Sequence, residues 1–149
     1  MFVENPLNSS PFIFPVLECF HLVGFAVAVG TIAMVDFSLL GFGMRRQTAA
    51  QLARSTGLWT ACSLAIVIFT GMLLFSSDPD MYYLNPAFLL KMFFLLSAIT
   101  FNYTIHRKVV AASQQARGGA LVACISLALW VCVVFGGIFI AFTDPFKKT

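Results

Sequence analysis

Four long runs of apolar residues, separated by short polar stretches, make up most of the chain. The runs cover residues 12–44, 56–75, 87–106 and 120–142. A run of about 20 apolar residues is long enough to cross the hydrocarbon core of a bilayer as one α-helix. The pattern therefore predicts an all-α integral membrane protein, a four-helix bundle that forms a single transmembrane domain over residues 1–149.

The composition excludes several classes of protein. Of the 149 residues, 60% are hydrophobic and only 10% are charged, which is too few charges for a soluble domain of this size. The sequence has no dense basic run of the kind that binds nucleic acid. We also find no nucleophile–base pair, phosphate loop or zinc-protease motif, which disfavours a stand-alone enzyme. The expected partners are the lipid bilayer and either other membrane subunits or further copies of the chain.

The basic residues predict how the chain is inserted. They gather in the loops after the first and third spans, where we find Arg45, Arg46, Arg54, Arg107, Lys108 and Arg117. Basic loops stay in the cytoplasm, so both termini are expected on the outer, periplasmic side of a bacterial inner membrane. Lys147 and Lys148 in the tail run against this rule. The segment before the first span has no Lys or Arg, so we expect that span to be retained rather than cleaved.

The first span is unusual because its apolar run contains ionisable residues, namely Glu18, His21 and Asp36. Such groups are costly inside a bilayer and often mark functional sites. Glu18 and His21 are three residues apart, and Asp36 follows Glu18 by 18 residues, which is five helical turns. One helical stripe should therefore have a polar group near each end, about 27 Å apart. We expect this stripe to face protein.

His21 is the main candidate for a cofactor ligand. A histidine inside a helical bundle can bind the iron of a b-type haem, and Gly24, one turn further on, would leave room for the macrocycle. Met72 and Met92 lie at a similar depth and could supply the sixth ligand. The same donors would also suit copper, and the glycines of this region could instead line a quinone site.

A purely structural reading of the outer residues is equally open. Glu18 and Lys91 are predicted at similar depth and could form an ion pair that offsets the desolvation of both. His21 would then be a packed histidine, hydrogen-bonded to a neighbouring helix or joined to Glu18 and Lys91 in a network that only fixes the helices.

A second polar group is expected at the inner side, formed by Asp36, Asn102 and His106. We predict that Asp36 pairs with an arginine or with Asn102. His106 is expected at the membrane boundary beside Arg107 and Lys108. It would lie about 15–20 Å from His21 along the membrane normal, too far for both to bind one iron.

Five segments of the chain carry a resemblance to a known family: PVLECFHLVGFA (15–26), GTIAMVDFSLLG (30–41), TGMLLF (70–75), NPAFLLK (85–91) and SLALW (126–130). They resemble an uncharacterised family of bacterial four-helix inner-membrane proteins, a domain of unknown function. The chain is more distantly similar to copper-resistance D and cytochrome b561-like bundles. The resemblance implies a four-helix fold but no activity, and the positions that match its motifs are Glu18, His21, Asp36, Asn85 and Lys91. The chain lacks the arginine of the family pattern G-R-x-I-A-Y, having G-I-F-I-A-F at 137–142.

The leading hypothesis from the sequence is a small membrane subunit for electron transfer. It would bind a b-type haem or line a haem or quinone site in a larger redox complex. Two alternatives belong to other classes: a non-catalytic structural or assembly subunit, and a protein that handles or transports a metal such as copper.

Overall fold

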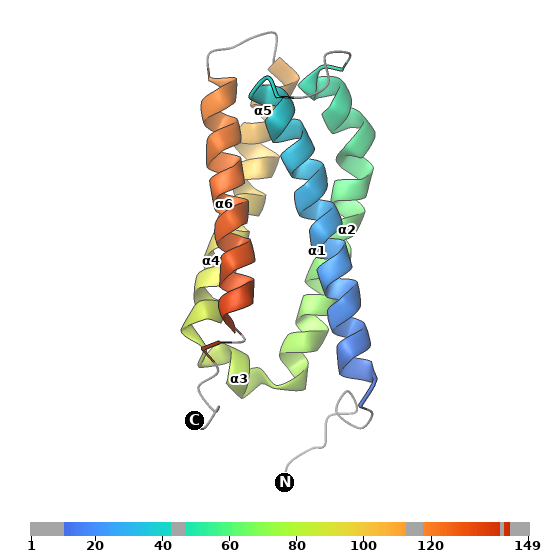
Figure 1. Ribbon diagram of the computed structural model, residues 1–149, viewed down its shortest axis with the longest axis vertical. Coiled ribbons are helices and arrows are strands. Elements are labelled where there is room, and N and C mark those ends of the chain that lie inside the picture. Colours follow the sequence, from blue (N-terminus) through green and yellow to red (C-terminus); the bar gives the residue numbers. More distant parts are fainter. Residues whose placement is uncertain (1–10, 43–46, 113–117, 141, 144–149) are drawn as a thin grey trace.

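A computed structural model describes residues 11–42, 47–112, 118–140 and 142–143 of the chain. Within them, every regular element is a helix: α1 (Ile13–Leu39), α2 (Ala49–Ser77), the short α3 (Pro79–Tyr83), α4 (Pro86–Phe101), the π-helix η2 (Asn102–His106), α5 (Arg107–Ala112) and α6 (Gly119–Ile140). Elements α4, η2 and α5 follow one another directly and form one long helical stretch (Figure 1).

Four helical stretches are long and apolar enough to cross a membrane, and they correspond to the four predicted spans. Large apolar side chains are exposed all along them, for example Phe20, Phe69, Phe93 and Phe135. A helix surface of this kind is stable only in contact with lipid or another protein. The protein is therefore a multi-pass membrane protein that contacts the lipid bilayer.

The first helix is shorter than predicted, because α1 ends at Leu39 rather than near residue 44. Gly41 has a φ of 81°, which favours glycine. Its N–H donates to the carbonyl of Ser38, and the N–H of Phe42 donates to that of Phe37, the pattern of a Schellman cap. The predicted last residues of the span, Gly43 and Met44, lie outside the described residues, as do Arg45, Arg46, Arg117, Lys147 and Lys148.

The second helix includes part of the connector that precedes the predicted span. We expected a short polar, helical connector over residues 47–55 and a span from residue 56, and α2 begins at Ala49 and runs through both. The Thr48 side chain accepts a hydrogen bond from the Gln51 N–H, and the Gln51 side chain accepts one from the Thr48 N–H. This capping box starts the helix in the polar segment, so Arg54 belongs to α2.

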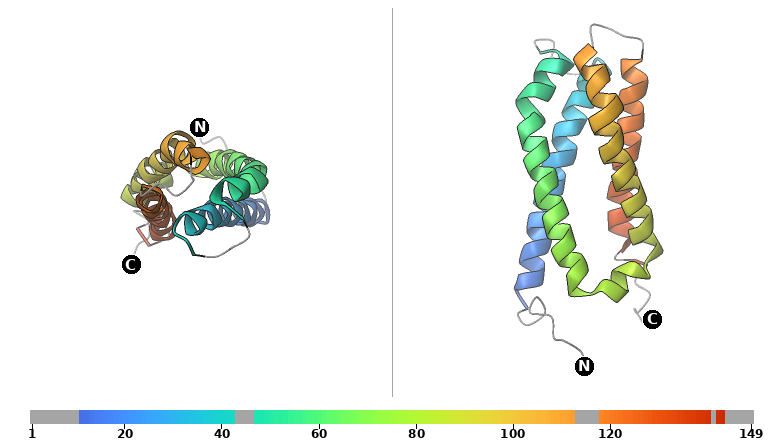
Figure 2. Two further views of the ribbon diagram at one scale, coloured as in Figure 1. Left: turned by 90° about the horizontal axis from the view of Figure 1, so that it is seen from above. Right: turned by 180° about the vertical axis from the view of Figure 1, so that it is seen from behind.

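The long helices form two antiparallel pairs, α1 with α2 and α4 with α6, and α1 and α6 join the pairs. Seen from above, the four stretches surround a common centre (Figure 2). Small residues and one tryptophan fill the middle of the core, with Ala28, Ala98 and Trp130 among its buried residues. We call the two ends of the molecule the α3 end, where α1 begins and α6 terminates, and the α5 end (Figure 1).

Candidate functional site

The most deeply buried charged group lies near the α5 end. Asp36 of α1 is 0% exposed. Its Oδ1 lies 2.6 Å from Nε2 of His106, and its Oδ2 accepts a hydrogen bond of 2.7 Å from the Ser126 hydroxyl. We call these three residues the Asp36 network. They come from α1, η2 and α6, so the network joins both helix pairs.

These contacts bear on the predicted partners of Asp36. The sequence reasoning paired Asp36 with an arginine or Asn102, but its partners among the described residues are His106 and Ser126. His106, predicted near the inner membrane boundary, is 4% exposed and buried within the bundle. The prediction that Asp36, Asn102 and His106 lie at the same end of the molecule is confirmed for Asp36 and His106 by their direct contact.

The π-helix explains why His106 faces inward. Ala98, Asn102, His106 and Val110 are all buried and are spaced four residues apart. In a regular α-helix the last of them would point about 120° away from the first. In η2 the Arg107 N–H instead bonds the Asn102 carbonyl, five residues back, and this wider turn cancels much of the rotation. The four side chains therefore line one inward stripe.

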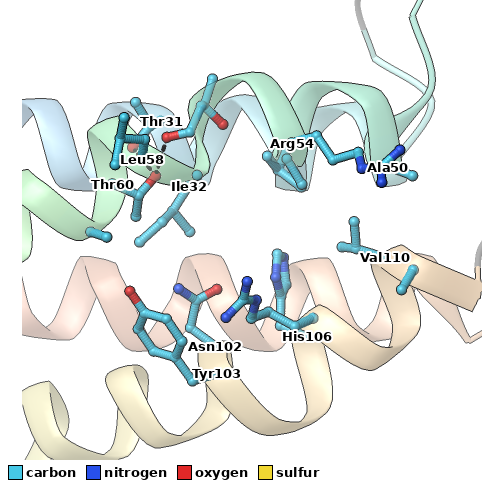
Figure 3. Close-up of a pocket in the computed structure, with 17 residues that line it drawn as sticks. Thr31, Ile32, Ala50, Arg54, Leu58, Thr60, Asn102, Tyr103, His106 and Val110 are labelled. Carbon is cyan, nitrogen blue, oxygen red and sulfur yellow. Dashed lines mark hydrogen bonds between the residues drawn. The ribbon is translucent and has the colours of Figure 1, made fainter.

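A pocket of about 710 Å³ lies beside this stripe, between α2 and the η2–α5 segment. In Figure 3, Asn102 and His106 on one wall face Thr60 and Arg54 on the other. The pocket combines apolar and polar side chains in its lining. It is lined by Thr31, Ile32, Val35, Ala50, Ala53, Arg54, Thr56, Gly57, Leu58, Thr60, Ala61, Asn102, Tyr103, His106, Arg107, Val110 and Ala111.

The pocket faces the outside of the molecule between α2 and η2. Leu58 and Tyr103 line it and are themselves 74% and 41% exposed. Its deeper wall includes Ile32 of α1 and the buried hydroxyl of Thr60, which donates a 2.8 Å hydrogen bond to the Thr31 hydroxyl. The pocket is therefore partly open to the outside between α2 and η2.

The hydrogen bonds of the Asp36 network also orient the His106 ring. An ionised carboxylate only accepts hydrogen bonds, so His106 donates from Nε2. In a neutral ring, Nδ1 is then the acceptor nitrogen, and the carboxylate fixes the tautomer of the ring.

At the α3 end, His21 has a protein partner. Its Nδ1 lies 2.9 Å from the Thr70 hydroxyl of α2. A Cβ placed on Gly71 would lie 3.2 Å from His21 Cε1, so this glycine leaves the room that the imidazole ring occupies. The predicted ligand is thus packed against the backbone of the neighbouring helix.

Of the other residues predicted around His21, Lys91 lies close enough to interact with it electrostatically. A Cβ on Gly24 would meet Ile66 and Val67 of α2 at 3.3 Å, so this glycine serves close helix packing. Met72 is 59% exposed, and Met92 is partly buried. Of the residues that the structure describes, no three His, Cys, Asp or Glu side chains form a metal-binding group.

The predicted ion pair between Glu18 and Lys91 does not form. Among the described residues, His106 and Asp36 make the one ion pair within 4.0 Å. Lys91 packs along α6, where a Cβ on Gly136 would lie 3.0 Å from its Cβ, while Glu18 is exposed. Burial raises the pKa of the Tyr82 hydroxyl on α3, and the charge of Glu18 raises it further.

Asn85 connects two helix ends at the α3 end. It is 0% exposed, and its Nδ2 donates to the Ile140 carbonyl at 3.1 Å. Its Oδ1 accepts from the Ala87 N–H at 2.9 Å and from the Thr143 hydroxyl at 2.8 Å. The side chain therefore caps α4 and holds it against the end of α6.

Comparison with known proteins identifies a family. Residues 13–143 match a family of unknown function, DUF6644. The chain belongs to this family. No curated protein and no solved structure matches it. Membership of DUF6644 assigns no activity, so the function is argued from the pocket and the Asp36 network.

The sequence reasoning missed most of the pocket wall. Arg54, Tyr103 and Ser126 were not singled out as site residues, although Ser126 lies within one of the segments that carry the resemblance. Arg54 was interpreted only as a signal of orientation, and Arg107 as such a signal or as a partner for Asp36. The useful signal was the position of Asp36, whose burial in a membrane requires donors on the facing helices.

Proposed function

We propose that the protein binds a lipid-soluble quinone in the pocket between α2 and η2 and serves electron transfer in the membrane. The observation that carries this proposal is the position of His106, which lines a laterally open, mostly apolar pocket and is held by a fully buried carboxylate. The sequence-based hypothesis placed a quinone site near His21, and we now propose it at His106.

The pocket wall offers what a quinone requires. Quinone oxygens accept hydrogen bonds, and the wall provides donors in Asn102 and Tyr103, joined by His106 when its ring is charged. Ile32, Val35 and Leu58 supply apolar surface for the ring. The open side allows an isoprenoid tail to remain in the lipid while the ring is bound.

The reaction we propose is reduction of the quinone to the quinol, or its reverse. The quinone takes up two electrons and two protons, and the electrons come from a haem or iron–sulfur centre of a partner subunit. His106 in its charged form gives one proton to a quinone oxygen and is reprotonated from the aqueous side. Asp36 orients the ring and stabilises its charged form through Nε2. The second proton comes from water.

This chemistry requires partners, so we propose that the protein works as a subunit of a larger membrane complex. We place it in the bacterial inner membrane with the α5 end toward the cytoplasm, because Arg54, Arg107 and Lys108 lie at that end. A cysteine introduced at Gln47 should then react with an impermeant maleimide only from the cytoplasmic side.

A b-type haem on His21 is the second candidate function. A similarity to cytochrome b561-like and copper-resistance D bundles would favour this candidate. The contacts of His21 with Thr70 and Gly71 support a packed histidine instead. Haem bands in the reduced-minus-oxidised spectrum of the purified protein, lost in His21→Ala, would favour this candidate over the quinone site.

The proposal is tested by equilibrium binding of a naphthoquinone with a short isoprenoid chain to the purified protein in detergent. His106→Gln keeps a donor for Asp36 but removes the second ring nitrogen, and we expect its Kd to rise about tenfold, the effect of about one hydrogen bond to a charged group. His21→Gln is the matched control and should bind as the wild type does. Equal Kd values for both variants, or loss of binding in His21→Gln alone, would reject the site at His106.

A further inference from the structure

Two permanent cations stand on opposite walls of the pocket. Arg54 lies on α2, and Arg107 lies at the start of α5. Both line the pocket. The Arg107 guanidinium lies 5.4 Å from the centre of the ring of Tyr103, which also lines the pocket. This cation–π contact favours a guanidinium position along the pocket wall. Arginine stays charged under all ordinary conditions, so both groups contribute positive potential.

The acidic residues that the structure describes do not neutralise these arginines. The carboxylate oxygens of Asp36 are hydrogen-bonded to His106 and Ser126. Glu18 lies near the start of α1, and Asp78 and Asp80 flank the start of α3, all at the α3 end (Figure 1). Neither Arg54 nor Arg107 forms an ion pair with any described residue. The pocket therefore has two cations and, among the described side chains, no free anion.

Lys108 shows that the arginines are not simply basic residues at the membrane boundary. It follows Arg107 directly and is also exposed, yet it does not line the pocket. A cation that only anchors a helix end can point into water, as an exposed lysine does. Arg54 and Arg107 are exposed as well, but they also border the space that the ligand would fill.

We infer that the pocket selects a quinone whose head group carries a negative charge, as an ionised hydroxyquinone does. This inference rests on the proposed function and names the ligand class for the same site. A planar anion between two guanidinium groups receives charge-assisted hydrogen bonds from both sides. The partly apolar surroundings weaken these interactions less than water would. A neutral quinone of the same shape does not receive these charge-assisted hydrogen bonds.

The test compares two ligands that differ in one charge: an alkyl hydroxynaphthoquinone, ionised at neutral pH, and its methyl ether, which is neutral. We expect the ionised compound to bind the wild-type protein about tenfold more tightly. Arg54→Gln and Arg107→Gln should each reduce this preference about threefold, and the double variant should remove most of it. Lys108→Gln is the matched control, because it removes a charge outside the pocket, and it should keep the full preference.

The results separate this inference from the function on which it rests. If the neutral ether binds but the ionised compound has no advantage, or if Lys108→Gln reduces the preference as much as the arginine variants do, the inference is wrong and the quinone site stands. If neither compound binds the wild-type protein, the proposed function itself fails. Circular dichroism of each variant verifies that the helices are retained.

Discussion

At the scale of single residues, Asp36 shows how a buried charge is accommodated in a membrane protein. A lone carboxylate in hydrocarbon is costly, and its cost falls when donors surround it. Both oxygens of Asp36 have such a donor, one on η2 and one on α6. The sequence alone could predict that Asp36 needs a partner. It could not identify the partners, because a serine such as Ser126 occurs in membrane helices for many reasons.

The network predicts a specific loss of stability in Asp36→Asn. An amide presents N–H groups where one carboxylate oxygen had accepted a hydrogen bond, so one donor of His106 or Ser126 loses its acceptor. We expect the free energy of unfolding in detergent to fall by about 2–4 kcal/mol. Ser126→Ala removes one hydrogen bond and should cost about 1 kcal/mol. An Asp36→Asn protein as stable as the wild type would show that the network does not hold the helices together.

At the scale of helices, local backbone features decide where side chains point. The four spans follow from apolar length alone, and they were predicted. The capped ends at Gly41 and Thr48 and the π turn at Asn102–His106 were not, because such features depend on hydrogen bonds that apolar patterning does not encode. The π turn brings His106 inward, so its contact with Asp36 could not be predicted from the apolar pattern.

Glycines decide how closely neighbouring helices pack. Gly136 of α6 faces the backbone of Lys91, and a Cβ there would lie 3.1 Å from the Lys91 Cα. Gly136→Ala should therefore force α4 and α6 apart and lower the free energy of unfolding by about 1–3 kcal/mol. Gly30→Ala is the matched control, since no atom lies within 4 Å of its added Cβ. We expect it to be neutral or slightly stabilising. Equal effects of the two substitutions in denaturant titrations would contradict the close contact.

At the scale of the whole molecule, the site arises from the way in which two helix pairs meet. α1 packs closely on α2, and α4 packs closely on α6, while the pocket lies where α2 faces η2 and α5. The sequence predicted two polar groups at opposite ends of the first span, and it emphasised Glu18, His21 and Lys91. It could not predict which end borders a pocket, because that depends on which helices are neighbours, and His21 instead packs against α2.

The most direct test of the central claim is photolabelling with an azidoquinone, followed by peptide mapping of the labelled residues. The account predicts saturable labelling of residues 56–61 and 102–111, which form the two facing walls of the pocket. An excess of unmodified quinone should prevent it, and His106→Gln should weaken it. Saturable labelling at the α3 end around His21 and Met72, or labelling that unmodified quinone does not compete, would contradict a quinone site at His106.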